Sequence, residues 1–296
     1  MFGSWRRAPN VDASGKTASP TRDPAMFANA NALAANPSPF VIPGAAKAIE
    51  PRFGATPEPM REDDALHSRL IAARLALIAE SVEIQRRVLR LDGRVYQAGL
   101  RFTHLFVINT GVFKVVTLSP DGREQIVGLK FRGDWLGFDG IADGQHDCDA
   151  IAMDTGEVWA IPYAALLQAG AARPALLGAL HEAMSREIAR DRNSLMSICT
   201  LPADARVADF LRNWAHALAR RGLRTDQITM RMTRAEIGNY LGVTLETVSR
   251  GLSRLARCGL IEFADKGRRE IRIPQVEALS AFVQECLTPV AGETLQ

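Results

Sequence analysis

Three polar residues with the chemistry to read DNA bases lie close together in the C-terminal part of the chain. Ser249 and Arg250 follow Glu246 by three and four positions, so on a helix the three side chains point the same way. In the major groove an arginine can donate two hydrogen bonds to guanine, a glutamate can accept one from cytosine, and a serine can bond to several base edges. The triad therefore predicts a base-reading surface; the alternative is an ordinary solvated helix face.

The residues around this triad predict a helix-turn-helix. Thr233 can cap a first helix with Glu236 at the capping-box position, and Gly242 can end that helix in the left-handed conformation. Thr244 can cap the second helix, with Thr247 in place of a glutamate. Two such helices joined by a glycine turn can place the second one in a DNA major groove. Their apolar sides consist of Ile237 and Leu241 on the first helix and Leu245, Val248, Leu252 and Leu255 on the second.

The flanking segments complete a winged arrangement. Asp204 follows the helix-breaking Leu201-Pro202 and can cap a helix that ends at Gly222. Strand-like segments occur at 228–230, 260–263 and 270–273, the last two joined by the turn Asp265-Lys266-Gly267-Arg268, and a terminal helix is expected at 276–287. Hydroxyl and basic side chains commonly contact backbone phosphates, and we expect such contacts from Thr233, Thr244, Thr247, Arg254, Lys266 and Arg268.

The run MTRAEIGNYLGVTLETVSRGLSRLARCGLIE resembles the DNA-binding helices of the Crp–Fnr superfamily of bacterial transcription regulators. Glu246-x-x-Ser249-Arg250 is similar to the fumarate-nitrate regulator branch rather than the cyclic-AMP receptor branch, and weaker similarity extends upstream to about Val82. The resemblance implies an α+β protein with an N-terminal β-roll (a cyclic-nucleotide-binding-like jelly roll), a long dimerisation helix and a C-terminal winged helix-turn-helix.

The same resemblance implies how the protein would act. It implies a homodimer that binds double-stranded DNA at an inverted repeat similar to TTGAT-N4-ATCAA, with Arg250 on guanine and Glu246 on the opposite-strand cytosine. RNA polymerase is the implied protein partner, with the hairpin around Asp121-Gly122 as its candidate contact. The residues do not distinguish an activator from a repressor.

The upstream pattern divides the chain into domains. Residues 1–64 are rich in Ala, Pro, Asn and Ser without a persistent period and predict a disordered extension. Asp64 can cap a helix that runs through Ile78. Beyond it, short segments separated by turn residues predict a sandwich or barrel with strands at 88–91, 94–96, 104–108, 112–118, 124–131, 151–153 and 158–161. The predicted boundaries are 1–64 for the extension, 65–172 for a β-roll sensor-like domain, 173–200 for the dimerisation helix, 201–287 for the winged helix-turn-helix and 288–296 for a tail.

Arg173-Pro174 opens a long predicted helix at about 174–199. Its apolar residues recur at steps of three and four, which favours a dimer seam, although a core helix of a single chain gives much the same pattern. Asp191 lies on or beside this seam; across a two-fold axis it would face its own copy, or it would point to solvent or pair with an arginine. The seam is predicted to contain Leu177, Leu180, Met184, Ile188, Asp191, Leu195 and Ile198.

The family's two best-known signals do not match the residues of the sensor-like domain. The cyclic-AMP branch binds its ligand through a Glu and an Arg-Ser/Thr pair, but the matching stretch 137–150 contains no arginine, and its aspartates would repel a phosphate. The oxygen-sensing branch holds a four-iron cluster through cysteine thiolates. No cysteine precedes Cys148, and Trp159 stands at the place of the β-roll cysteine. We therefore expect neither ligand.

Haem and thiol chemistry are the remaining alternatives, and no cofactor is identified. A haem- or gas-responsive sensor would need an axial ligand, for which His67, His104, His146 and His181 are candidates. Asp147 and Asp149 should raise the thiol pKa of the neighbouring Cys148, which argues against a reactive thiolate.

Composition sets broader limits. The net charge is +3, but residues 206–272 carry 14 Lys and Arg against 7 Asp and Glu, so this segment is +7 and the remainder −4, which suits phosphate contact. We find no membrane-spanning apolar run of about 18 residues and no secretory h-region. The cysteines lack CxxC spacing, so reduced thiols in the cytoplasm are expected. No nucleophile–base pair, phosphate loop or HExxH motif points to an enzyme.

Overall fold

The computed structural model describes residues 62–287 except 120, 265–266 and 268. The predicted tail and residues 1–61 of the predicted extension lie outside the described residues. Residues 62–64 belong to helix α1 (Glu62–Ser81), which therefore begins before the predicted cap Asp64. None of the helices in the described part of the chain is long and apolar enough to cross a membrane.

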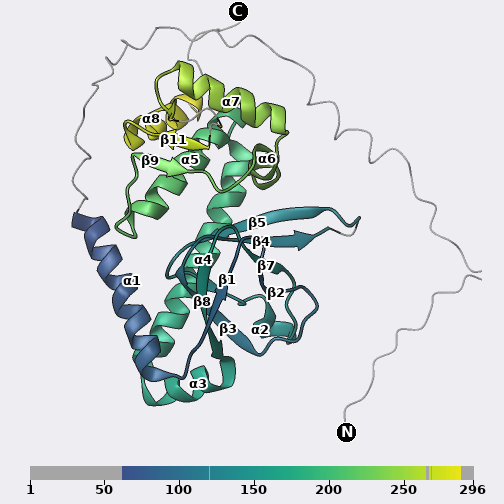
Figure 1. The fold of residues 1–296 in the computed structure, drawn as a ribbon, viewed down its shortest axis with the longest axis vertical. Helices are drawn as coiled ribbons and strands as arrows, with labels where there is room; N and C mark the ends of the chain where they lie inside the picture. The colour runs from purple at the N-terminus through teal and green to yellow at the C-terminus, as the bar shows by residue number, and fades with distance from the viewer. Residues whose placement is uncertain (1–61, 120, 265–266, 268, 288–296) are drawn as a thin grey trace, which may run out of the picture. The chain divides into compact units, whose positions relative to one another are not determined.

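Two antiparallel sheets form the β-roll and confirm the predicted mixed fold (Figure 1). One sheet has the strand order β1-β8-β3-β6 and the other has the order β2-β7-β4-β5. Strand β3 is apolar on both faces, because Phe106 and Ile108 face the core between the sheets while Leu105 and Val107 pack with Leu75 of α1. The strands are β1 (Gln85–Leu89), β2 (Arg94–Tyr96), β3 (His104–Thr110), β4 (Phe113–Leu118), β5 (Glu124–Lys130), β6 (Trp135–Leu136), β7 (Asp149–Ala152) and β8 (Gly156–Pro162).

Most predicted strands match within a few residues, but three short elements were not predicted. These are β6, helix α2 (Gly140–Asp143) and helix α3 (Tyr163–Ala172). Strand β6 and α2 are too short to show a period. Helix α3 reads YAALLQAGAA, which has no charged face. Strand β1 also begins earlier than predicted and ends at Leu89.

The long helix α4 (Pro174–Thr200) is present as predicted, but its first half packs into the core and its second half is largely exposed. Its first half buries Leu176 and Leu180 in the core of its own chain, together with Leu166 of α3. Leu180 is only 4% exposed, so its predicted place in a dimer seam is wrong. The second half leaves Ile188 and Leu195 exposed.

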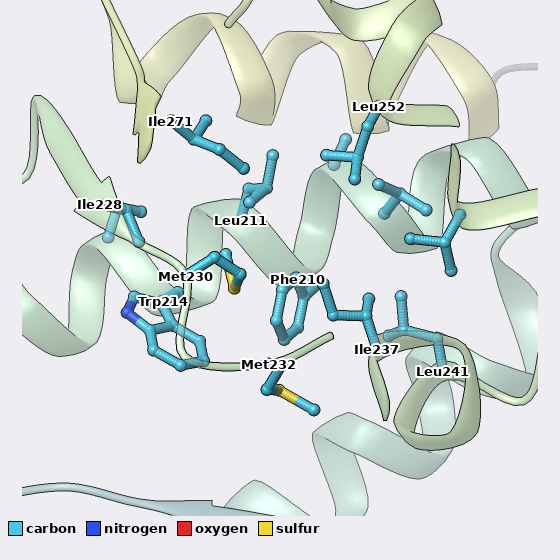
Figure 2. Packing of buried hydrophobic residues seen from close by; sticks show 14 of the residues in the cluster. Phe210, Leu211, Trp214, Ile228, Met230, Met232, Ile237, Leu241, Leu252 and Ile271 are labelled. Atoms are coloured by element: carbon cyan, nitrogen blue, oxygen red, sulfur yellow. The ribbon is translucent and has the colours of Figure 1, made fainter. Parts of the chain in front are cut away.

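The C-terminal part forms the predicted winged helix-turn-helix around one apolar core (Figure 2). Phe210, Leu211 and Trp214 of α5 pack against side chains from the helices and the small sheet β10-β11-β9, such as Leu252 and Ile271. Helix α5 is capped by Pro202, without a side-chain hydrogen bond, so the predicted cap Asp204 is wrong. The elements are α5 (Ala203–Ala219), β9 (Gln227–Thr229), α6 (Arg234–Leu241), α7 (Leu245–Arg257), β10 (Glu262–Phe263), β11 (Glu270–Arg272) and α8 (Val276–Leu287).

Candidate DNA-binding interface

Both helices of the helix-turn-helix begin at the predicted threonine caps. The Thr233 hydroxyl accepts a hydrogen bond from the Glu236 backbone N–H, and the Glu236 carboxylate accepts one from the Thr233 backbone N–H, which completes the capping box. The Thr244 hydroxyl accepts from the Thr247 backbone N–H at 3.2 Å. These bonds satisfy donors that a helix start leaves unpaired.

Two glycines fix the angle between the helices. Gly242 has a φ of 65° and ends α6 in the left-handed conformation, as predicted. Gly238 was not predicted to matter, yet a Cβ there would lie 2.6 Å from the Val243 carbonyl oxygen. The turn therefore packs directly against the backbone of α6, which only a residue without a side chain permits.

The predicted reading triad lies together on the first turns of α7. Glu246 and Arg250 are exposed and Ser249 is half-buried. The Arg250 guanidinium donates to the Thr247 hydroxyl at 3.4 Å. A backbone N–H and the Thr244 hydroxyl hold the pKa of the Glu246 carboxyl below its usual range, so at neutral pH it is an acceptor, as contact with a cytosine amine requires.

The opposite side of α7 is apolar, with one exception to the prediction. Val248, Leu252 and Leu255 are buried as expected. Leu245 is 46% exposed, because it is the first residue of the helix and projects beyond the core. The packing of α7 against α5 is close, since a Cβ on Gly251 would lie 3.1 Å from Val207.

The residues predicted to contact phosphates have different surroundings in the structure. Thr233, Thr244 and Thr247 use their hydroxyls in the caps and remain at the helix starts, where backbone N–H groups favour anions. Arg254 forms an ion pair with Asp204 and lies over the Phe282 ring, so it holds α7 to α5 and α8 instead of extending freely from the surface. The wing residues Lys266 and Arg268 lie outside the described residues.

The predicted dimer-seam residues are exposed in the single chain only along the second half of α4. Ile188 is 50% and Leu195 is 62% exposed, and Met196 and Ile198 are exposed beside them. Asp191 is exposed on the same helix. Leu177 and Met184 are partly buried against the core of their own chain. The exposed apolar side chains form a stripe that a single chain leaves uncovered.

The place where the family would hold a cyclic nucleotide contains a buried cluster of this chain's own side chains. The His146 ring stacks on Tyr96 with 3.8 Å between ring centroids. Asp139 Oδ2 lies 3.4 Å from His146 Nδ1 and accepts the Asp147 backbone N–H. Burial is the largest cause that raises the pKa of the Cys148 thiol to about 12, and the charge of Asp139 is the second. The predicted direction of this shift is therefore confirmed, but the adjacent Asp147 and Asp149 are not its main cause.

The candidate haem ligands lie on different elements. His67 is on α1 and bonds to the Asp63 carbonyl oxygen, His104 begins β3, His146 is in the buried cluster and His181 is exposed on α4. In the described residues no three His, Cys, Asp or Glu side chains are grouped as a metal site. Haem binding stays an alternative, which a Soret band in the purified protein would support.

Comparisons with known proteins cover both parts of the chain. The family description of a Crp-like helix-turn-helix domain matches residues 205–282, and that of a cyclic nucleotide-binding domain matches residues 86–172. Electron transport regulator A of Shewanella oneidensis is 35% identical over 182 residues, which cover 62% of this chain and 73% of that protein. The fumarate and nitrate reduction regulatory protein of Salmonella typhimurium is 36% identical over 188 residues, covering 64% and 74% of the two chains. The solved structure of FixK2 from Bradyrhizobium japonicum is 26% identical with a TM-score of 0.59, and the match covers 71% of this chain and 100% of that one.

Proposed function

Because the chain belongs to the Crp–Fnr family of DNA-binding transcription regulators, we propose that it acts as a homodimer that reads an inverted repeat similar to TTGAT-N4-ATCAA. The proposal rests on the triad of Glu246, Ser249 and Arg250, which lies on the first turns of α7 after the Thr244 cap, with Glu246 and Arg250 exposed. In this arrangement Arg250 reads guanine and Glu246 reads the cytosine paired with it.

The stripe on α4 supports the dimer. Its apolar side chains are exposed in the single chain, and a two-fold axis along α4 would cover them with their own copies. A two-fold dimer also places two recognition helices about one DNA turn, ~34 Å, apart, which matches an inverted repeat. We further propose that the exposed hairpin at Asp121 contacts RNA polymerase.

We propose that the protein is not regulated by binding a cyclic nucleotide or a four-iron cluster. Residues 137–150 offer aspartates in place of a phosphate-binding arginine, and His146 and Tyr96 pack together there. A cluster needs several thiolates, and no cysteine precedes the buried Cys148.

The test is fluorescence anisotropy with a TTGAT-N4-ATCAA duplex and a scrambled duplex at one salt concentration, because phosphate contacts make affinity salt-dependent. The wild-type chain should prefer the repeat. Arg250→Ala should cost roughly 1–3 kcal/mol per half-site and relax the preference at the guanine. Arg257→Ala is the matched control, since Arg257 is exposed at the far end of the same helix, and it should leave the preference unchanged.

Two outcomes would contradict the proposal. Equal weak binding of the wild-type chain to both duplexes would reject the assigned repeat. An equal loss on both duplexes for Arg250→Ala would make Arg250 a phosphate contact instead of a base contact.

A further inference from the structure

Three segments that are distant in sequence meet at the side chain of Asp134, which follows β5. Arg190 of α4 donates to Asp134 Oδ1 at 2.7 Å, and Arg221, which follows α5, donates to Oδ2 at 2.9 Å. The Phe131 backbone N–H also donates to Oδ2, at 2.9 Å. One carboxylate of the β-roll therefore binds both α4 and the segment after α5. Helix α5 begins the DNA-binding part of the chain, residues 203–287, which we call the reading head.

This ion pair is buried. The side chains of Asp134 and Arg221 are 7% and 8% exposed. Arg221 donates further hydrogen bonds to the carbonyl oxygens of Arg132 and Ala217, and its guanidinium lies 5.0 Å from the Phe131 ring centroid. The Arg221 guanidinium thus donates hydrogen bonds both to the β-roll, at Arg132, and to α5, at Ala217. Removing one partner from a buried pair leaves an uncompensated charge, so the pair resists separation.

The backbone turn at Asp134 is also held in place. Gly133 has a φ of 84°, and a Cβ there would lie 2.6 Å from Ile71 of α1. The Gly133 backbone N–H donates to the Ile108 carbonyl oxygen at 2.8 Å. The carboxylate is therefore presented from a turn packed between α1 and β3.

A second contact holds the first helix of the reading head to the β-roll. The Asn239 side chain of α6 accepts from the Ile126 backbone N–H at 2.6 Å and donates to the Glu124 carbonyl oxygen at 2.7 Å. Lys114 of β4 pairs with Glu236 of the capping box. These contacts involve α6 only, whereas Glu246 and Arg250 of α7 remain exposed. The docked arrangement is therefore compatible with DNA binding and does not cover the reading face.

We propose that Asp134, through Arg221 and Arg190, is a positioning residue that fixes the orientation of the reading head for DNA binding. A dimer reads its repeat only when both recognition helices have the correct spacing and direction. A head that is free to reorient spends only part of its time in that geometry, and its apparent affinity falls by that fraction. This inference rests on the DNA-binding function but not on the identity of the repeat.

The test uses Asp134→Asn in the full chain, which keeps the shape of the side chain and removes its charge. We expect its affinity for the repeat duplex to fall at least about 10-fold. Hydrogen exchange at the Ile126 amide should become faster because α6 undocks, while the core amides of α7 stay protected. The matched control is Asp226→Asn, since Asp226 pairs with the exposed Arg224 within the C-terminal part alone, and its affinity should not change.

Unchanged affinity of Asp134→Asn would overturn the proposal. If Asp134→Asn loses both its affinity and the hydrogen-exchange protection of α7, the reading head has unfolded. Arg190→Gln then decides, because Arg190 is 40% exposed and forms one of the two ion pairs of Asp134. Weaker binding by Arg190→Gln with α7 protected supports the proposal, and wild-type binding overturns it. If the wild-type chain shows no preference for the repeat, the comparison is made on the duplex that it selects from a random pool, which separates this test from the assignment of the repeat.

Discussion

At the scale of single residues, burial and neighbouring charge decide which side chains are chemically available. Glu246 is ionised and exposed at a helix start, where it can accept from a base. Asp209 is buried, and its carboxylate accepts hydrogen bonds from Ser197 of α4 and from Asn213. Two acidic residues of the same C-terminal part therefore differ in role, because one faces solvent, whereas the other is buried and accepts hydrogen bonds from side chains of its own chain.

The cysteines provide a residue-scale prediction. Burial raises the pKa of the Cys148 thiol to about 12, whereas Cys199 and Cys258 are exposed. Iodoacetamide reacts with thiolates, so at pH 8 we expect Cys258, which lies outside the proposed dimer stripe, to be alkylated well before Cys148. Peptide mass spectrometry over time measures the two rates, and the urea-unfolded chain is the control in which they should converge. Alkylation of Cys148 as fast as Cys258 in the folded chain would refute the prediction.

At the scale of elements, the helix-turn-helix depends on caps and on one close backbone contact. The threonine caps and the left-handed Gly242 set where α6 and α7 begin and end. The space at Gly238 sets how closely the turn approaches α6. Both are needed for the direction in which α7 presents its polar face.

Gly238→Ala tests that contact. The added Cβ would lie 2.6 Å from the Val243 carbonyl oxygen, so the backbone must shift, and we expect the free energy of unfolding to fall by roughly 1–3 kcal/mol. Gly178→Ala is the control, since Gly178 lies within α4 with open space at its Cβ, and alanine there should stabilise by roughly 0.5–1 kcal/mol. Urea unfolding measures both variants. Equal stability of Gly238→Ala and the wild type would show that the turn accommodates a side chain.

At the scale of the whole molecule, the two halves of α4 have different surroundings. Its first half packs Leu176 and Leu180 into the core of its own chain, and its second half exposes an apolar stripe. An exposed apolar stripe of this kind commonly marks an interaction surface. The proposed dimer would bury it.

Ile188→Glu tests the dimer. Across a two-fold axis the substitution places two carboxylates in a desolvated contact, and we expect the dimer dissociation constant to rise roughly 100-fold or more. Sedimentation equilibrium measures this constant. Leu167→Glu is the control, because Leu167 is an exposed leucine of α3 outside the stripe, and it should leave the dimer intact. A variant Ile188→Glu that remains dimeric would move the interface away from this part of α4.

Elements whose signals are local can be predicted from the amino-acid sequence alone. The caps at Thr233 and Thr244, the left-handed Gly242 and the positions of Glu246, Ser249 and Arg250 on one helix face follow from spacing and backbone geometry alone. The long helix and the antiparallel strands followed from hydrophobic periodicity.

The contacts of each side chain depend on how the elements pack, and they could not be predicted from local patterns. Periodicity places Leu180 and Ile188 on one face of α4, but it does not say that the β-roll covers the first and leaves the second exposed. Arg254 is basic on a DNA-binding helix, yet it pairs with Asp204 of α5. The pair of Asp134 and Arg221 joins residues that are 87 positions apart, and such a contact depends on the packing of whole elements, because no local pattern records it.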